Sequence, residues 1–554
     1  MCISVDGMGD DARGPAHGAA DVLDVLVVGA GFGGMYAIQR LRGLGFSVRS
    51  VERGHAVGGT WYWNRYPGAR CDIESLEYSY SFSPELAQEW EWTQRYPTQP
   101  EMRAYAEHVA DRFDLRPHIA FGVTVTAAVY DEVGTCWHVD TDAGERITAR
   151  FLVLATGVLS AASVPRFPGQ ERFRGRIVHT GSWPEDTTVD GLRVGVVGTG
   201  SSGIQVVPHL AERAAHLTVF QRTANYSISA ANQPLDAAYV RDVKARYPEL
   251  REQARRSFTG STVPINRQSA LAVDQEERDR RFEERWALGG FAFLGSFDDV
   301  TRDPEANRLA ARFVEDKIRA AVDDPAVAEQ LVPTGHPIGS RRICVDTGYH
   351  GTFNLPHLRL VDVRRAPITG LTEAGLCTAD GEEHPLDLLV LATGFDAMTG
   401  SFVRIDVRGR DGVTLREKWA DGARTHLGLQ TAGFPNLFTL TGPGSPAVLC
   451  NMFLAIEQHV DWVADLLVAL RERGCRTVEP TPEAEQEWSA QVARAAERTL
   501  YPQADSWYVG ANVPGKPRVF LPYAGGVGKY RRICEEIAAD GYRGFVVDAD
   551  LTVR

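Results

Sequence analysis

The sequence lacks any apolar run that approaches the ~18 residues of a membrane-spanning helix. It also lacks a basic excess, because 59 Lys and Arg stand against 72 Asp and Glu and the formal net charge is −13. Such a chain has no positive field for nucleic acid or anionic lipid, so we expect neither nucleic acid nor membrane as a partner. The first twenty residues show no apolar segment behind a basic start. Residues 1–21 are therefore expected to form a disordered tail and not a signal peptide.

Paired and metal-like cysteines are also missing. Eight cysteines are scattered along the chain, with no C-x-x-C pair and no zinc-like spacing with histidine. In a chain of this size the pattern favours free thiols in a reducing compartment, which predicts a cytoplasmic protein with no metal site. It also argues against a disulfide reductase, which needs a redox-active cysteine pair.

What the chain does have is a glycine turn near its start. The apolar segment 24–28 precedes Gly29-x-Gly31-x-x-Gly34 and a helical pattern, and the next predicted strand ends at Glu52, 23 residues after Gly29. Glycines at these positions let a dinucleotide pyrophosphate approach the backbone, and an acid at this offset binds a ribose hydroxyl. The carboxylate would repel a 2′-phosphate, so this site favours a cofactor without one, such as FAD.

A second copy of the pattern follows at 193–223. The segment 193–197 leads into Gly198-Thr-Gly-Ser-Ser-Gly203, and at the offset of the acid stands Gln221 followed by Arg222 and Thr223. An arginine with a hydroxyl beside it suits a 2′-phosphate, so the second site favours NADPH over NADH.

Two further apolar segments, 151–157 and 388–394, each end in Ala-Thr-Gly and are typical of buried parallel strands. The 554 residues exceed what one core supports, and the repeats predict an α/β protein with two Rossmann-like dinucleotide-binding domains, the second inserted in the first. A charged, helically patterned stretch adds a helical insertion whose charges form a solvated face. The predicted divisions are 22–158 and 386–547 for the FAD domain with substrate-site loops, 159–225 and 331–385 for the NADPH domain, and 226–330 for the insertion.

Between the two turns stands Phe173-x-Gly175-x-x-x-His179-x-x-x-Trp183-Pro184, a spacing that no dinucleotide fold requires. With this motif between two GxGxxG turns, and with the block 58–75, the chain resembles the type I Baeyer–Villiger monooxygenases over about residues 22–547. Within that family it is most similar to the phenylacetone and steroid monooxygenase branch, which shares the longer loop 445–451.

The resemblance implies a function and a set of site residues. It implies an FAD- and NADPH-dependent enzyme that uses O2, through a C4a-peroxyflavin, to insert oxygen beside a ketone carbonyl, with bulky aryl, alicyclic or steroid-like ketones as substrates. It assigns catalysis to Arg342 with Asp72 as its carboxylate partner. It places around FAD the residues Gly29, Gly31, Gly34, Glu52, Thr60, Trp61, Tyr62, Trp63, Cys71, Asp72, Tyr78, Val125 and Met452. It places around NADPH the residues Thr199, Gly200, Ser201, Ser202, Gly203, Ile204, Gln205, Arg222, Thr223 and Arg341, with Arg70, Arg342 and Trp507 near its other end.

One position departs from the family pattern, because the family usually has lysine where this chain has Arg341. Arginine keeps the charge but changes the geometry around a phosphate. For two residues, His179 and Cys71, we predict a structural role. We interpret His179 as a structural group that, with Trp183, pins the linker between the nucleotide domains, and Cys71 as a packing residue.

Two alternatives to ester formation remain open at this point. A flavin monooxygenase that oxidises nitrogen or sulfur would share both glycine turns, and an NADPH-binding flavoprotein without turnover would keep the fold. The first is disfavoured by the complete motif ending at Pro184, and the second by the retention of Asp72 and Arg342. No obligatory protein partner is predicted.

Overall fold

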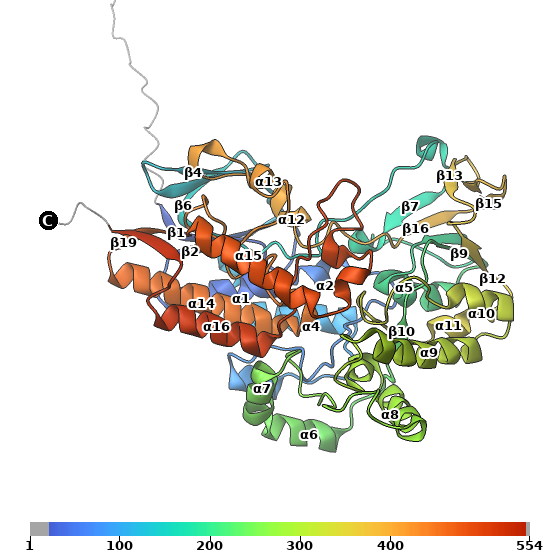
Figure 1. The fold of residues 1–554 in the computed structure, drawn as a ribbon. Helices are drawn as coiled ribbons and strands as arrows, with labels where there is room; N and C mark the ends of the chain where they lie inside the picture. Colours follow the sequence, from blue (N-terminus) through green and yellow to red (C-terminus); the bar gives the residue numbers. More distant parts are fainter. Residues whose placement is uncertain (1–21, 550–554) are drawn as a thin grey trace, which may run out of the picture.

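A computed structural model describes residues 22–549, so the predicted tail at 1–21 lies outside the described residues. Two separate sheets organise the described chain (Figure 1). The first runs in the order β17-β4-β5-β6-β1-β2-β3, with β18 also paired to β6. Its strands are β1 (Leu23–Val28), β2 (Val48–Glu52), β3 (Ile119–Phe121), β4 (Val125–Asp131), β5 (Cys136–Thr141), β6 (Arg146–Leu154), β17 (Asp406–Arg408) and β18 (Leu437–Thr439).

The second sheet has five strands in the order β12-β9-β8-β16-β7 and is parallel throughout. They are β7 (Arg176–His179), β8 (Arg193–Val197), β9 (His216–Gln221), β12 (Leu358–Asp362) and β16 (Leu388–Leu391). Strands from 358–391 thus complete a sheet begun at 176–221, and strands from 406–439 complete one begun at 23–154. This interleaving gives the nested α/β arrangement that the sequence repeats predict.

The position of β16 corrects one predicted boundary. The sequence division at 386 assigns Leu388–Leu391 to the returning FAD domain, but β16 pairs with β7 and β8 in the second sheet. An apolar run ending in Ala-Thr-Gly suits a buried parallel strand in either sheet, so its composition does not identify its neighbours. The chain crosses back to the first sheet only after residue 394, and β17 is the first strand there.

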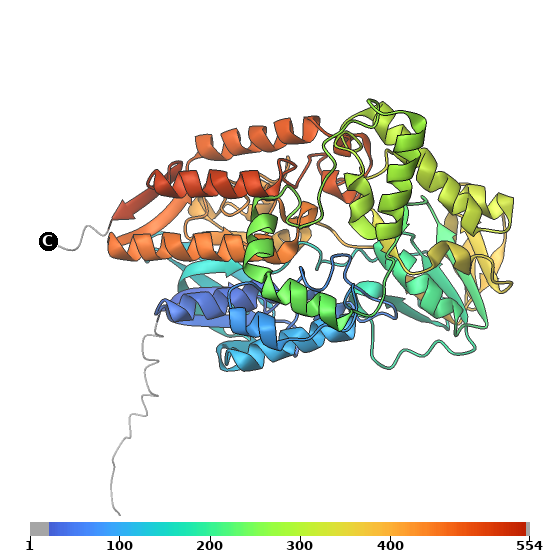
Figure 2. The same cartoon turned by 90° about the horizontal axis from the view of Figure 1, so that it is seen from below.

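The inserted segment contributes helices to the cores beside both large sheets. Its helices are α6 (Ala237–Ala245), α7 (Tyr247–Arg256), α8 (Gln275–Leu288), α9 (Pro304–Ala321) and α10 (Pro325–Leu331). Phe282 of α8 and Val314 of α9 are buried in the core beside the second sheet, whereas Tyr247 of α7 joins the core beside the first. Figure 2 shows the insertion lying between the part of the chain built on the first sheet and the part built on the second.

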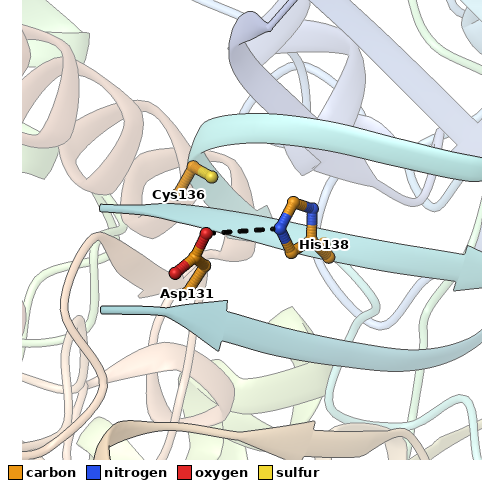
Figure 3. A group of neighbouring side chains, drawn as sticks. All are labelled: Asp131, Cys136 and His138. Atoms are coloured by element: carbon orange, nitrogen blue, oxygen red, sulfur yellow. Dashed lines mark ion pairs between the residues drawn. The ribbon is translucent and has the colours of Figure 1, made fainter. Parts of the chain in front are cut away.

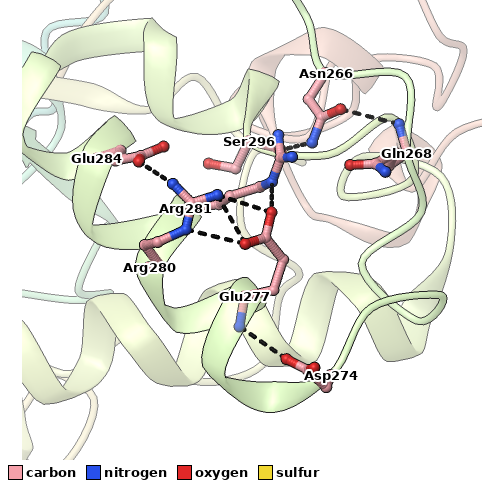
Figure 4. Close-up of polar contacts among 8 residues, drawn as sticks. All are labelled: Asn266, Gln268, Asp274, Glu277, Arg280, Arg281, Glu284 and Ser296. Carbon is pink, nitrogen blue, oxygen red and sulfur yellow. Dashed lines mark hydrogen bonds and ion pairs between the residues drawn. The ribbon is translucent and has the colours of Figure 1, made fainter.

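The charged run on α8 forms a solvated face, as expected. Asp274 caps the helix by accepting a hydrogen bond from the amide of Glu277, and Glu277 accepts hydrogen bonds from Arg280 and Arg281 on the next turn (Figure 4). These groups are exposed or half-buried, so the network is an ordinary helix-surface arrangement worth a few tenths of a kcal/mol per pair.

The long helix predicted from Met452 onward is α14 (Met452–Glu472), but it is buried on more than one face. The sequence predicts an amphipathic helix, whereas α14 packs against both α1 (Phe32–Gly43) and α16 (Val527–Ala539). Its polar residues Glu457 and His459 are accordingly buried and hydrogen-bonded. No helix within residues 22–549 has the length and apolar character needed to cross a bilayer.

The remaining helices and three small sheets complete the described chain. The helices are α2 (Thr60–Trp63), α3 (Pro84–Glu89), α4 (Gln99–Arg112), α5 (Ser201–Ala211), α11 (Tyr349–Thr352), α12 (Gly400–Val403), α13 (Leu415–Lys418) and α15 (Pro482–Glu497). Three small sheets pair β10 (Ser227–Ser229) with β11 (Cys344–Asp346), β13 (Ile368–Leu371) with β14 (Gly375–Thr378) and β15 (Glu383–Pro385), and β19 (Cys475–Pro480) with β20 (Phe545–Ala549).

Candidate active site

The first glycine turn joins β1 to α1 and requires glycine on steric grounds. Gly29 has φ +108°, and a Cβ there would lie 2.6 Å from the carbonyl oxygen of Ala155. A Cβ on Gly34 would lie 1.9 Å from the carbonyl oxygen of Gly29. Glu52, at the end of β2, accepts hydrogen bonds from the amides of Ala30 (2.8 Å) and Gly54 (2.7 Å). The carboxylate is thus held beside the start of α1, as a ribose-binding acid must be.

The second turn, between β8 and α5, repeats this geometry. Gly198 has φ +110°, and a Cβ there would lie 2.4 Å from the carbonyl oxygen of Ala392. A Cβ on Gly203 would meet the carbonyl of Gly198 at 2.2 Å, whereas the space beside Gly200 is open. Ala155 and Ala392 belong to the two Ala-Thr-Gly segments of the sequence. Each such segment therefore packs against the glycine turn of its own domain.

A cavity of about 490 Å³ extends from the first turn toward α5. Most of the predicted cofactor residues line it, namely Gly29, Gly31, Glu52, Thr60, Trp61, Trp63, Arg70, Cys71, Asp72, Tyr78, Val125, Ser201, Ser202, Gln205, Arg342, Met452 and Trp507. Its size, its mixture of aromatic and polar walls and the free amides at the start of α1 fit a flavin dinucleotide.

Several predicted residues do not line this cavity. Gly34 and Gly203 are packed against their own turns, and Ile204 is 1% exposed in the core beside the second sheet. The Tyr62 hydroxyl accepts a hydrogen bond from the amide of His55, and its ring lies under the Arg65 guanidinium. These four residues support the walls of the site and do not line the cavity. A motif match alone does not distinguish supporting residues from lining residues.

A cationic site lies beyond the second turn. Arg341 is half-buried, its Nε has no hydrogen-bond partner in the described chain, and burial together with the positive charge of Arg222 lowers its pKa. The Arg222 side chain is exposed and has no ion-pair partner among residues 22–549. Thr223 follows it, and its carbonyl accepts a hydrogen bond from the Thr199 hydroxyl. Two neighbouring guanidinium groups fit the 2′-phosphate of NADPH, and the nearby Asp505 carboxylate only partly offsets their effect on the pKa of Arg341.

Arg342 points the other way, into the large cavity, and forms a two-point ion pair with Asp72. Its Nε donates to Asp72 Oδ2 at 2.7 Å and its Nη2 to Oδ1 at 2.8 Å, while Nη1 donates to the carbonyl of Val448 at 2.6 Å. The ring of Phe291 lies 4.8 Å from the guanidinium carbon. Burial alone would lower the pKa of Arg342, but the carboxylate of Asp72 outweighs it and raises that pKa. The result is a permanent, oriented cation in the cavity wall.

The Phe173–Pro184 motif lies on the second sheet and at its crossing to the first. A Cβ on Gly175 would meet the Phe173 ring at 2.4 Å and the carbonyl of Asp387 at 2.6 Å, so only glycine fits. His179 accepts a hydrogen bond from the amide of Gly181 (2.9 Å) and meets the Phe395 ring edge-on at 5.9 Å. Burial lowers the pKa of His179.

Trp183 is buried beside the second sheet, and Pro184 follows it directly. Gly181 and Phe395 line the cavity. The motif therefore connects the core of the second domain to the cavity wall.

Cys71 precedes Asp72 and lines the cavity, but its thiol is poorly suited to reaction. Its side chain is buried in the core, and burial raises its pKa well above the usual value. Seven cysteines lie within the described residues, and all are free thiols. We therefore retain the packing role for Cys71.

The comparisons with known proteins agree with this geometry. A family model described as pyridine nucleotide-disulphide oxidoreductase matches residues 26–281. A Baeyer–Villiger monooxygenase of Pseudooceanicola batsensis is 42% identical over 95% of this chain and 96% of its own length. A phenazine N-monooxygenase of Lysobacter antibioticus is also 42% identical, over 95% of this chain and 97% of its own. The structure of an oxidized steroid monooxygenase bound to NADP is 54% identical and covers 96% of this chain and 100% of its own, with a TM-score of 0.92.

The chain belongs to the Baeyer–Villiger monooxygenase family. The enzyme is an NADPH-dependent flavin monooxygenase, with FAD and NADPH as cofactors and O2 as co-substrate. The predicted fold class, reaction class and cofactors are confirmed by this membership. It also separates the chain from disulfide reductases, although the matching family model is described by that name.

Sequence reasoning missed several groups of this monooxygenase site. The backbone carbonyl of Val448 and the ring of Phe291 both contact the Arg342 guanidinium. No sequence motif marks either contact, because one is a backbone atom and the other comes from the insertion. The segment 156–161 lines the cavity directly after β6. This segment was detectable, since ligands bind outside the carboxyl ends of parallel strands.

Proposed function

We propose that this Baeyer–Villiger monooxygenase converts bulky aryl, alicyclic or steroid-like ketones to esters or lactones, and that Arg342 and Asp72 are its catalytic pair. The observation that carries this proposal is the two-point Arg342–Asp72 ion pair in the wall of the flavin-sized cavity. The preference for bulky ketones is supported by the 54% identity to a steroid monooxygenase. In the balanced reaction, ketone, O2, NADPH and a proton give ester, water and NADP+.

The chain's own residues contribute binding, orientation and charge. When bound, reduced FAD would supply the electrons that activate O2, from which the inserted oxygen comes. Arg342 stabilises the negative charge that develops on the attacking oxygen and then on the former carbonyl oxygen. Three of its five N–H donors are fixed by Asp72 and Val448, and the side chain of Tyr508 also interacts with the guanidinium. Asp72 acts by orientation, since it holds the guanidinium plane in one direction.

The cofactor-binding roles are part of the same proposal. The first glycine turn and Glu52 would bind the FAD pyrophosphate and ribose, with the aromatic walls Trp61, Trp63 and Tyr78 enclosing the rest. Arg222, Thr223 and Arg341 would bind the 2′-phosphate of NADPH, while Arg70 and Trp507 would lie near its other end. The supporting observation is the Arg341 Nε that lacks a partner.

Oxidation at nitrogen is a second candidate activity, favoured by one observation. The phenazine N-monooxygenase relative is as similar to this chain as the first Baeyer–Villiger relative, at 42% identity each. Overall similarity therefore does not by itself separate oxygen insertion from N-oxidation in this chain.

A substrate panel separates these activities. Purified enzyme with NADPH is offered a steroid ketone, phenylacetone, cyclohexanone and phenazine, and products are identified by mass spectrometry. The proposal requires esters or lactones from the ketones, with the highest kcat/KM on the larger ones. N-oxide formation from phenazine with unchanged ketones would establish the second candidate. NADPH oxidation that yields only hydrogen peroxide would contradict both.

The domain division and the cellular setting also stay proposals. With the β16 correction, we assign 22–158 and 395–547 to the FAD domain and 159–394, insertion included, to the NADPH domain. A small-molecule substrate fits the relatives, whereas a cytoplasmic location and the lack of an obligatory protein partner remain predictions.

A further inference from the structure

The β4–β5 hairpin carries three metal-ligand side chains on one face. Asp131 ends β4, and Cys136 and His138 lie on β5, where Asp131 pairs with Cys136 and Val129 with His138. Because side chains alternate along a strand, these three share one side of the sheet, while Tyr130 and Trp137 on the other side are buried in the core. Figure 3 shows the three side chains pointing toward one another.

The distances fit a bound ion better than a hydrogen bond. One potential ligand atom from each residue lies within 4.8 Å of the others. His138 Nε2 and Asp131 Oδ2 are 3.6 Å apart, which is beyond the ~3.2 Å limit of a good N–H···O bond. Two ligands that each lie ~2.1 Å from a tetrahedral zinc are roughly 3.4 Å apart. The pair is therefore spaced as two ligands of one metal are.

The surrounding contacts prepare the three groups for coordination. The Nδ1 of His138 is 3.1 Å from the Thr148 hydroxyl, which orients the ring and leaves Nε2 for an ion, as partners of metal-bound histidines do. Asp131 Oδ1 accepts a hydrogen bond from the amide of Val133 at 2.9 Å, which fixes the direction of the carboxylate. Asp131 and His138 are each 36% exposed in their side chains, so an ion can enter from solvent.

Two features oppose coordination and set its strength. Cys136 is 7% exposed, so its thiol is less accessible to an ion than the other two groups. Arg476, which donates to the carbonyl of Gly134 at 3.0 Å, brings a positive charge close by, and this charge favours the thiolate but repels a cation. These opposing effects predict moderate affinity and a preference for ions that bind thiolate well.

We propose that Asp131, Cys136 and His138 form a surface site for one thiophilic divalent cation of the Zn²⁺ class, with water as the fourth ligand. The site is separate from the flavin cavity, whose wall includes none of the three residues. The sequence predicted no metal site because the pattern Cys-x-His has no zinc-like partner nearby, and the hairpin supplies the third ligand. Within residues 22–549 no other group of three such side chains is this close.

The test is zinc binding by the FAD-loaded full-length enzyme, measured by equilibrium dialysis and elemental analysis. We expect about one Zn²⁺ per chain with micromolar affinity, not displaced by excess Mg²⁺. The substitutions Asp131→Asn and His138→Gln alter partly exposed side chains, so folding is preserved, and each should weaken binding at least tenfold. The matched control Cys377→Ser removes a half-buried thiol on β14 and should leave binding unchanged.

Two further measurements keep the proposal falsifiable. Zn²⁺ should raise the Tm of the wild-type enzyme, and this rise should disappear in His138→Gln and in Cys136→Ser while flavin content stays constant. Unchanged stoichiometry and affinity in Asp131→Asn and His138→Gln would overturn the site. A Cys377→Ser variant that loses the ion would also overturn it, because zinc would then be bound elsewhere.

Discussion

Arg342 and Asp72 stand 270 positions apart in the chain and meet through two parallel hydrogen bonds of 2.7 and 2.8 Å. A planar guanidinium held at two points by a carboxylate keeps both its charge and its direction. The pair lies in the wall of the flavin-sized cavity, and this placement makes it the centre of the proposed chemistry.

Replacement of Arg342 by alanine should abolish ester formation, with kcat lowered at least ~10²-fold, because the cation that stabilises developing oxyanion charge is lost. Arg342→Lys keeps a charge without the two-point contact and should retain more activity. Asp72→Asn keeps the shape and removes the charge, so it should fall between these two. Product formation is measured by gas chromatography at equal flavin content. Undiminished ester formation by Arg342→Ala would rule out the proposed role.

The 2′-phosphate site predicts a selective loss of NADPH use. Arg341→Ala and Arg222→Ala should each raise the KM for NADPH roughly tenfold or more, since a charged hydrogen bond contributes about 1.5–3 kcal/mol. The KM for NADH should stay nearly constant, because NADH has no phosphate there. The ratio of kcat/KM values for the two coenzymes is the measurement. Equal losses with both would indicate damage to the fold instead.

His179 is predicted to support coupling and not proton transfer. Its ring connects β7 to Phe395 at the crossing between the domains, so His179→Ala should let NADPH oxidation continue while less ester forms per NADPH. His179→Asn offers an acceptor to the Gly181 amide and should recover part of the coupling. The readout is the ratio of ester to hydrogen peroxide. Intact coupling and turnover in His179→Ala would contradict the linker role.

Buried histidines predict loss of stability in acid. His459 is fully buried, accepts a hydrogen bond from the Thr441 amide at Nδ1, and has its pKa lowered by burial to about 3. An unfolded histidine has a pKa near 6.5, so the unfolded chain binds more protons between pH ~6.5 and ~3. The contribution of His459 is complete above ~6.5 and declines by ~1.4 kcal/mol per pH unit as the pH falls.

Thermal unfolding of the FAD-loaded enzyme at pH 7.5, 6.5 and 5.5 checks this expectation. The Tm should change little between the first two and drop at the third. His459→Gln should lower the Tm at pH 7.5 and show a shallower drop on acidification. The exposed His216→Gln serves as control and should follow the wild type. A Tm that is constant down to pH 5.5 would contradict the expectation.

Local patterns predicted the nucleotide-binding part of this molecule well. Both glycine turns, the acid at Glu52 and the Ala-Thr-Gly strands depend on short segments whose steric needs are visible in the sequence. The partner strands of β16 were not predictable, because a fully apolar strand carries no information about its neighbours. Burial of α14 between two helices was missed for a similar reason, since contacts with α16 arise from residues far along the chain.

The site could be predicted only in part from residues alone. Family resemblance supplied Arg342 and Asp72, whereas physical reasoning by itself treats two consecutive arginines as a surface feature. The structure distinguishes the two arginines, because Arg342 lines the cavity whereas Arg341 lies outside its wall and within the electrostatic influence of Arg222. The hydrogen bond from Arg342 to Val448 is accepted by a backbone carbonyl. Every residue has this group, so no sequence pattern marks it.

Distant segments hold the Arg342 side chain, among them the loop with Asp72, the insertion with Phe291 and the turn with Val448. During synthesis on the ribosome the last of these emerges only after four-fifths of the chain has been made. A polypeptide that ends before this turn lacks one of the groups that hold the guanidinium, and it also lacks α14, which packs against the helix that follows the first glycine turn. Loss of the last fifth of the chain would therefore disturb both the aim of Arg342 and the support of the first nucleotide turn.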